Sequence, residues 1–402
     1  MLQRKPVAEQ ISVATADPVR VLIVGAGMAG LTLAQLLRRD GLHPVLVERA
    51  APRADPGYML ALMPLVDPVF DRLGLTGEYL ARSERLARYR IRGRDGSPVR
   101  EYAMTDLLDR FGDYRGISRG AALEVLSSLG GTVTHECTVT AIDQDAGGVR
   151  ATISDGAENH TAEFDVVIAA DGLHSATRSL VLEPSEVDIY DTGWGGWVAW
   201  MDTDAEPDLG EELWGAGAFV GSYPVRDRIG ILVGGPRAET AAGPAAFVAR
   251  VRSAVTAADG RVARVLDRVA TEPDEQYFWP LTDCRSARWS TGRVVLLGDA
   301  AAGFLPTAGI GACMAMESAL ALAGQLRDTT PAGVPQALRA FELAQRPRVE
   351  SAQQNSRQLA KLLFRRSGLL AAVRDIAARY MPLELALRPI RTLLAGQEVT
   401  AR

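Results

Sequence analysis

A glycine-rich turn that directly follows a short hydrophobic strand constrains the fold of this chain more than any other feature. Residues 21–24 (VLIV) lead into Gly25, Gly27 and Gly30, which complete the pattern GxGxxG, and leucines at helical spacing follow. In such a turn the first glycine allows a tight bend, the second lets the backbone approach a pyrophosphate, and the third lets helix and strand pack closely. The helix N-terminus then presents free N–H groups to the anion. The pattern predicts a dinucleotide-binding βαβ unit.

The second strand of this unit, predicted over residues 44–47 (PVLV), ends at an acidic residue. Glu48 lies 18 residues after Gly30, where a carboxylate can accept hydrogen bonds from the adenosine ribose hydroxyls. An acid at this position favours an unphosphorylated ribose, as in FAD or NAD, over NADP. The fingerprint alone does not separate NAD from FAD.

The composition excludes several classes of protein. The net charge of the 402 residues is −5, so we expect no basic field that would neutralise nucleic-acid phosphates. The three cysteines lack CxxC spacing, which predicts neither a disulfide framework nor a thiolate zinc site, and reduced thiols are typical of a cytoplasmic protein. None of the four histidines has a second histidine four residues away, so no metal site is predicted.

Neither targeting nor membrane insertion is predicted. Residues 1–18 lack the apolar core of a signal peptide, so we expect them to form a flexible tail. No apolar stretch approaches the roughly 18 residues that a membrane-spanning helix needs, so no transmembrane segment is expected.

Two later strands also end in an acidic residue next to glycine. Residues 164–170 (FDVVIAA) are predicted as a buried parallel strand that ends at Asp171, and residues 293–297 (RVVLL) lead through a glycine to Asp299. A proline- and glycine-containing loop then leads into a helical run over residues 312–326. This second strand, loop and helix unit places another helix N-terminus, and therefore another anion site, near the first.

Together these motifs resemble those of the FAD-dependent monooxygenases of the para-hydroxybenzoate hydroxylase type, often called class A. The resemblance runs from about Arg20 to about Glu350. Its carriers are GAGMAG with Glu48 and Arg49, ISRGAALEVL around Arg119, DGLHSATR from Asp171, and the long segment WSTGRVVLLGDAAAGFLPTAGIGACMAMESA. The resemblance implies an α/β fold in which a Rossmann-like FAD-binding domain of the glutathione-reductase type is interleaved with an antiparallel β-sheet substrate domain, followed by C-terminal helices.

The resemblance also implies the residues that bind the cofactor. The glycine turn and Glu48 would hold the ADP half of FAD, and Arg119 would meet its ribityl or phosphate portion. Asp299 would bond to the ribityl chain, and the backbone after Pro306 would face the isoalloxazine, while Asp171 belongs to a motif linked with both FAD and NAD(P)H. The implied set is Gly25, Gly27, Met28, Ala29, Gly30, Glu48, Arg49, Arg119, Asp171, Asp299, Pro306, Gly309, Gly311 and Ala312.

The expected domain organisation follows from the positions of these motifs. A tail over residues 1–18 precedes the first part of the FAD-binding domain over 19–184, which carries inserted substrate-domain segments near 55–110. The substrate-binding sheet occupies 185–285, the second part of the FAD-binding domain 286–350, and a helical region 351–402. This last region carries an apolar stripe with interleaved basic residues, which predicts a helix that covers the FAD domain or a dimer seam, with a membrane surface or partner helix as the alternative.

The middle of the chain supplies the predicted substrate site, because small-molecule sites are apolar clefts between domains. Trp194 and Trp200 share one face of a predicted strand, and Trp197 takes the other. We predict that Trp194, Trp200, Phe219 and Met59 edge the cavity, with ordinary core packing as the alternative for the tryptophans. The segment WGAGAFVG contains glycines at the wrong spacing for a second fingerprint and is predicted to be a hairpin.

The function implied by the resemblance is oxygen transfer to a small molecule. NADPH or NADH would reduce FAD, O2 would add to give a flavin C4a-hydroperoxide, and an aromatic or polyketide-like substrate would be hydroxylated or epoxidised, in secondary metabolism or aromatic degradation. No catalytic side chain is implied, and the protein would be a monomer or homodimer. The chain departs from the family pattern at Ala302, Cys313 and Ser318, where many relatives have histidine, asparagine and aspartate. Substrate and proton handling are therefore not defined by the resemblance.

Three other functions share the architecture. A flavin halogenase needs a lysine near the substrate, and none lies between Lys5 and Lys361. A prenyl reductase of the geranylgeranyl reductase type would transfer hydride without consuming O2. A non-catalytic protein of the Rab GDP-dissociation-inhibitor type would lack the ribityl-binding acid that Asp299 supplies.

Overall fold

Alternate residues of the first long strand are buried on opposite sides of a parallel sheet. The computed structural model describes residues 1–52, 57–104, 111–381 and 388–400. On β2 (Val21–Val24), Val21 and Ile23 pack towards helices, whereas Leu22 and Val24 pack towards a small antiparallel sheet. Such burial on both faces explains the uninterrupted hydrophobic run in the sequence.

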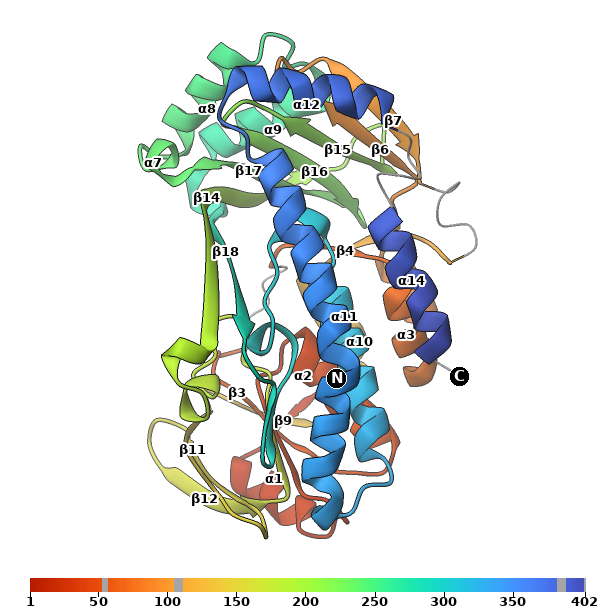
Figure 1. Cartoon of the computed structure of the whole chain (residues 1–402), viewed down its shortest axis with the longest axis vertical. Coiled ribbons are helices and arrows are strands. Elements are labelled where there is room, and N and C mark those ends of the chain that lie inside the picture. The colour runs from red at the N-terminus through yellow and green to blue at the C-terminus, as the bar shows by residue number, and fades with distance from the viewer. Residues whose placement is uncertain (53–56, 105–110, 382–387, 401–402) are drawn as a thin grey trace.

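The parallel sheet forms the lower half of the molecule (Figure 1). Within the described residues its strand order is β1-β9-β3-β2-β13-β20-β19, and all pairs are parallel except the last. Helices α2 and α10 pack together on one face, and the three-stranded sheet β10-β11-β12 covers the other. The bounds are β1 Gln3–Arg4, β9 Thr132–His135, β3 Val45–Glu48, β13 Val166–Ala169, β20 Val294–Leu296, β19 Ser290–Thr291, α2 Met28–Arg39, α6 Arg119–Ser127, α10 Gly311–Leu326, β10 Thr138–Gln144, β11 Val149–Ser154 and β12 Asn159–Phe164.

A larger, mostly antiparallel sheet forms the upper half (Figure 1). Its order in the described part of the chain is β18-β14-β17-β16-β15-β6-β7, where only β15 and β6 pair in parallel. One face of this sheet packs on α8 and α9, and the other face is turned towards the half that contains the parallel sheet. The bounds are β18 Tyr277–Ser286, β14 Val187–Asp202, β17 Arg228–Pro236, β16 Phe219–Val225, β15 Leu209–Trp214, β6 Arg88–Arg92, β7 Pro98–Ala103, α7 Arg237–Thr240, α8 Pro244–Ala254 and α9 Gly260–Thr271.

Smaller elements and C-terminal helices connect the two halves. The long helix α11 runs from the parallel sheet to the upper sheet, α12 lies across the top of the molecule, and α14 lies beside α3 in the view of Figure 1. The remaining bounds are β4 Met59–Leu62, β8 Arg115–Ser118, β5 Glu84–Arg85, α1 Val7–Ala14, α3 Asp67–Leu73, α4 Thr76–Arg82, α11 Val334–Leu363, α12 Gly368–Tyr380 and α14 Arg388–Thr400.

The predicted α/β architecture is confirmed, including strands from the inserted segment near 55–110 that join the large sheet. The predicted hairpin is also confirmed, because β15 and β16 pair across a turn at Gly217. The domain boundaries stay predictions, and α11 crosses the one placed at residue 350. Parts of the predicted segments, residues 55–56, 105–110, 382–387 and 401–402, lie outside the described residues.

The expectation of a flexible tail over residues 1–18 is wrong. Strand β1 pairs with β9, and helix α1 packs against the parallel sheet through the buried side chains of Val7 and Ala14. Gln10 fastens the helix, because its side-chain amide donates to the carbonyl of Leu46 at 3.1 Å and accepts from the N–H of the same residue at 3.1 Å. The expectation of a flexible tail rested on the lack of a signal-peptide apolar core in residues 1–18, and this lack does not exclude a short amphipathic helix.

Replacing Gln10 with alanine should therefore destabilise the fold. The change leaves a buried backbone N–H and C=O of Leu46 without these side-chain partners, and each such loss costs about 1–3 kcal/mol. A fall in the free energy of unfolding, measured by urea denaturation, checks the prediction. Glu9→Ala on the exposed side of the same helix is the control, and equal stability of the two variants would contradict the assigned role of Gln10.

Candidate active site

One cavity of about 770 Å³ joins the glycine turn to the upper sheet. Its nucleotide end is lined by Gly27, Arg119 and Asp299, and its far end by side chains of β6, β15 and β16. Residues of α11 and α12 complete the wall, so the C-terminal helices help to enclose the cavity. The cavity therefore lies between the two halves of the fold, where small-molecule sites are typically found.

The three glycines of the turn have different surroundings. A Cβ atom on Gly25, whose φ is +104°, would lie 2.4 Å from the carbonyl oxygen of Ala170, and one on Gly30 would lie 1.9 Å from the carbonyl oxygen of Gly25. A Cβ on Gly27 would meet no atom of the described residues within 4 Å, and Gly27 lines the cavity together with Met28 and Ala29. Two glycines thus permit the turn itself, while the third leaves open space for a ligand.

Glu48 lies at the end of β3 beside this turn. Its carboxylate accepts hydrogen bonds from the N–H groups of Ala26 at 2.8 Å and Ala50 at 2.7 Å. The neighbouring Arg49 is exposed to solvent. Contact of either side chain with a ribose or phosphate stays a prediction.

Asp299 and Arg119 line the nucleotide end of the cavity together. The Asp299 side chain is exposed to the open space of the cavity, but desolvation by the surrounding protein raises its pKa to about 6, and the positive charge of Arg119 opposes this shift. Desolvation and the charge of Arg119 act on the Asp299 carboxylate but no hydrogen bond from the described residues does, and the carboxylate faces the open space of the cavity. A carboxylate next to an arginine can bind the hydroxyl chain and phosphates of a flavin nucleotide, so the residues present fit FAD.

The loop before α10 supplies the remaining predicted contacts. A short 3₁₀ turn spans Pro306–Ala308, Gly309 after it adopts φ +59°, and α10 begins at Gly311. No side chain of the described residues caps this helix, and Pro306, Gly309, Gly311 and Ala312 line the cavity. The first N–H groups of α10 therefore lack intrahelical partners and face ligand space.

Asp171 does not line the cavity but fixes the turn that follows β13. It accepts hydrogen bonds from the Ser175 hydroxyl and from the Thr177 N–H at 3.0 Å. Arg178 of the same motif donates to the carbonyl oxygens of Leu173 and Ala300, both at 2.9 Å. The DGLHSATR motif thus ties the strand end to the segment that carries Asp299.

Of the predicted substrate contacts, only Met59 lines the cavity. Trp194 stacks on Phe364 at 4.6 Å between ring centroids, and Phe219 packs edge-on against the same ring. Trp200 donates from its indole to the carbonyl of Gly57 at 2.9 Å. The predictions for Trp194, Trp200 and Phe219 are therefore wrong for this cavity. Phe364, which follows α11, covers Trp194 and Phe219, and the indole of Trp200 bonds to Gly57 instead. The predicted faces of the strand are right, since Trp197 packs on the opposite side with Phe247.

Sequence reasoning missed the polar wall at the far end of the cavity. This wall comes from Tyr89, Glu212, Trp214 and Tyr223, with Tyr114 beside them. Alternation along β15 provides a partial signal, because Glu212 and Trp214 share a face. These two side chains lie next to Tyr89 because β15 pairs in parallel with β6, and no local sequence pattern reveals this pairing.

Cys313 is a packed core residue. Its thiol is fully buried, accepts from the N–H of Met63 at 3.3 Å, and has a pKa raised to about 12 by burial. The other two atypical positions are also structural, since Ala302 is buried and Ser318 accepts from the Gln345 side chain at 3.1 Å. None of the three supplies an ionised group to the cavity.

The three cysteines should resist thiol reagents in the folded protein. All are buried, and burial raises the pKa of each, so the reactive thiolate is scarce at pH 8. We expect no labelling by Ellman's reagent at pH 8 and the release of three equivalents after unfolding in guanidinium. Rapid labelling of the native protein would contradict the burial of these side chains.

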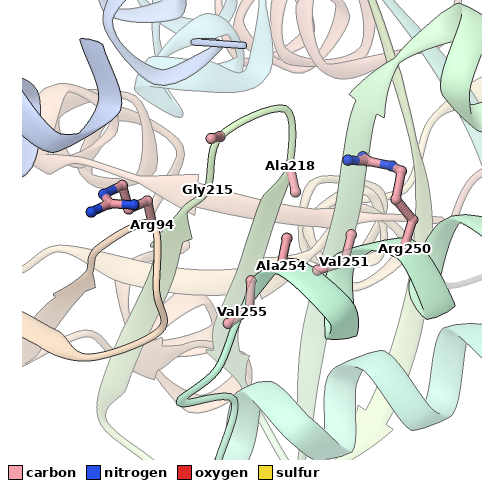
Figure 2. Close-up of a pocket in the computed structure, with 8 residues that line it drawn as sticks. Arg94, Gly215, Ala218, Arg250, Val251, Ala254 and Val255 are labelled. Atoms are coloured by element: carbon pink, nitrogen blue, oxygen red, sulfur yellow. The ribbon is translucent and has the colours of Figure 1, made fainter. Parts of the chain in front are cut away.

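A second, smaller pocket of about 170 Å³ lies away from the cavity, between the β15–β16 turn and α8 (Figure 2). Figure 2 shows Arg94 and Arg250 on opposite sides of it, with small side chains between them. Arg250 is held by Glu239 at 3.0 Å and by the carbonyl of Gly217 at 2.8 Å. The Arg250 guanidinium is therefore engaged within the protein.

The fold and the cavity are those of a flavoprotein that joins a nucleotide-binding half to a substrate-binding sheet. A family profile described as "FAD binding domain" matches residues 18–356. The chain belongs to this family of FAD-dependent monooxygenases, which includes the aromatic hydroxylases.

Curated relatives and solved structures agree with this assignment. The chain is 32% identical over 362 residues to the 3-amino-4-hydroxybenzoate 2-monooxygenase PtmB3 of Streptomyces platensis, which covers 84% of this chain and 87% of the relative. A 3-amino-4-hydroxybenzoate 2-monooxygenase of Streptomyces cremeus is 31% identical, covering 85% and 87%. The structure of Klebsiella pneumoniae HpxO complexed with FAD and uric acid has the same fold, with a TM-score of 0.81, 24% identity and coverage of 94% and 97%.

The chain is therefore an FAD-dependent monooxygenase that uses NAD(P)H and acts on a small molecule, as the resemblance predicted. The halogenase, prenyl reductase and non-catalytic alternatives are not supported. In the part of the chain that the structure describes, no helix has the length and apolarity to cross a membrane. The same residues contain no cluster of three or more potential metal-ligating side chains.

Proposed function

We propose that the protein hydroxylates a small aromatic ring that carries hydroxyl or amino groups. The observation that carries this proposal is the continuous cavity that extends from Gly27 and Asp299 to the aromatic wall around Tyr223. A planar ring in such a space packs against aromatic and aliphatic side chains and lies beside the nucleotide end. The names of the Streptomyces relatives support an aminohydroxybenzoate or a similar compound.

In this proposal the chain positions its ligands and excludes water. When bound, FAD supplies the transfer of an oxygen atom from O2 after reduction by NAD(P)H. Arg119 and Asp299 would hold the ribityl and phosphate portion, and the N–H groups at the start of α10 would face the flavin ring. The apolar residues of the cavity would keep water from the reacting atoms. The proposed cofactor contacts are Gly27, Met28, Ala29, Glu48, Arg49, Arg119, Asp299, Pro306, Gly309, Gly311 and Ala312. The other predicted residues, Gly25, Gly30 and Asp171, would shape the turns around the cofactor.

Oxygen uptake with a panel of aromatic compounds tests the proposed function. Purified protein loaded with FAD should show slow NADPH oxidation alone and at least about tenfold faster oxidation with its substrate, because substrate binding completes the site. The panel contains 3-amino-4-hydroxybenzoate, salicylate, 4-hydroxybenzoate and catechol, and product mass identifies a gain of 16 Da. Failure of every aromatic compound to stimulate O2 uptake would overturn the proposal, and turnover without O2 uptake would favour a reductase.

We further propose that the protein is a monomer or homodimer in the cytoplasm. The buried thiols of Cys137, Cys284 and Cys313 support a reducing location. Sedimentation analysis of the FAD-loaded protein tests the assembly state, and a tetramer would contradict it.

A further inference from the structure

Glu212 occupies an unusual position in the wall of the cavity. Only 5% of the residue is exposed, and it lines the cavity from strand β15. Its carboxylate accepts hydrogen bonds from the indole N–H of Trp214 at 2.7 Å and from the hydroxyl of Tyr223. The hydroxyl of Tyr89 also bonds to it. Three neutral donors therefore surround one buried acid.

Other buried acids in the described part of the chain have a positive partner. Five Asp and Glu residues are buried, and four of them form ion pairs with arginine. The neighbouring Glu211, on the opposite face of β15, pairs with Arg92 at 2.8 Å and Arg90 at 3.2 Å. The four pairs are Asp165 with Arg20, Glu211 with Arg92, Asp283 with Arg357, and Glu317 with Arg348.

A buried carboxylate without a counter-ion is costly to the fold, so its presence is best explained by a ligand. Burial raises the pKa of Glu212, whereas the hydrogen bonds from Tyr223, Tyr89 and Trp214 lower it because they stabilise the ionised carboxylate. Burial together with the adjacent acid raises the pKa of Tyr89 and Tyr223, so both phenols stay protonated and act as donors. An ionised carboxylate can accept about four hydrogen bonds. Three are in place, which leaves capacity for a donor from within the cavity.

We propose that Glu212, oriented by Tyr89, Tyr223 and Trp214, is the specificity-determining residue that binds a hydroxyl or amino group on the substrate ring. The proposal rests on the proposed function and names the chemistry of its substrate. A phenolic O–H or an aromatic N–H donates to the carboxylate. A fluorine at the same place cannot donate a hydrogen bond, and an anionic group there is repelled by the carboxylate. Sites that hydrogen-bond a polar substrate group discriminate strongly against analogues that lack it.

The test compares 3-amino-4-hydroxybenzoate with 3,4-difluorobenzoate, which replaces both donors by small acceptors. Binding to the oxidised, FAD-loaded protein is followed by the change in flavin absorbance. Because a hydrogen bond to a charged group is involved, the wild type should bind the amino-hydroxy compound about 10- to 100-fold more tightly. In Glu212→Gln this preference should fall at least about tenfold, while affinity for the difluoro compound changes little.

Glu211→Gln is the matched control, because it neutralises the neighbouring buried acid outside the cavity. It should retain the wild-type preference. A preference that survives in Glu212→Gln, or is lost equally in Glu211→Gln, would overturn the assignment to Glu212. If Glu212→Gln fails to fold, the affinities of the wild type still test the proposal. Equal affinity of the wild type for the two compounds, or binding of neither, would overturn it.

The two proposals fail in different ways. Oxygen uptake stimulated by aromatic compounds, combined with an unchanged preference in Glu212→Gln, would leave the hydroxylase function standing and reject the role of Glu212. Preferential binding that depends on Glu212, without stimulated oxygen uptake by any aromatic compound, would support the binding site and reject the hydroxylase function.

Discussion

Replacing Gly30 with alanine should destabilise the fold and prevent FAD retention, whereas Gly27→Ala should leave the fold intact and weaken FAD binding alone. A Cβ on Gly30 would lie 1.9 Å from the carbonyl oxygen of Gly25, and a backbone atom cannot move away as a flexible side chain can. Overpacking of this kind costs about 1–3 kcal/mol or more. Gly27 has φ −74° and open space around it, so alanine fits the protein but occupies the space that FAD would enter.

Two measurements separate these effects. The melting temperature of protein stripped of FAD should fall by several degrees in Gly30→Ala and stay near wild type in Gly27→Ala. In titrations with FAD, Gly27→Ala should bind about 10- to 100-fold more weakly, as expected when one or two backbone contacts to a charged phosphate are lost. Wild-type FAD affinity in Gly27→Ala would place the pyrophosphate elsewhere. If the melting temperature of Gly27→Ala were as low as that of Gly30→Ala, Gly27 would be needed for the turn itself and would not merely leave space for FAD.

Local patterns were sufficient to predict the nucleotide half of the molecule. Three patterns were visible within short windows of the sequence: the hydrophobic run at 21–24, the glycine turn and the helical run at 312–326. They correspond to β2, the turn before α2, and α10. Strands buried on both faces are hydrophobic throughout, so such runs are easily recognised in the sequence. Asp299 could be located in the same way, because it directly follows such a strand.

The substrate end of the cavity could not be predicted because distant segments build it. Tyr89 meets Glu212 only because β6 pairs with β15, and Phe364 displaces Trp194 from the cavity only because α11 returns to the upper sheet. Hydropathy treats a buried glutamate as a surface residue, so the sequence pattern could not distinguish Glu212 from its ion-paired neighbour Glu211. The N-terminal helix was missed for a related reason. Its few buried side chains are buried by contact with β3, which is distant in the sequence, and not by a pattern within the helix.

The affinity for FAD should rise as the pH increases from 5 to 7, because Asp299 must lose its proton to accept hydrogen bonds from a ligand. In the ligand-free protein desolvation raises its pKa to about 6. Binding that favours the ionised form lowers this pKa, so protonation competes with FAD below pH 6 and not above it. For one such group, affinity at pH 5 should be about tenfold weaker than at pH 7.

Asp299→Asn should remove this pH dependence and weaken FAD binding at pH 7 by about 10- to 100-fold, because a charged acceptor becomes a neutral amide. Asp143→Asn, an exposed acid on β10, should match the wild type at both pH values. A pH dependence that persists in Asp299→Asn would assign the titration to another group. A wild-type affinity that is flat between pH 5 and 7 would mean that the Asp299 carboxylate does not accept hydrogen bonds from FAD, and that Arg119 and the N-terminus of α10 provide the polar contacts at this end of the cavity.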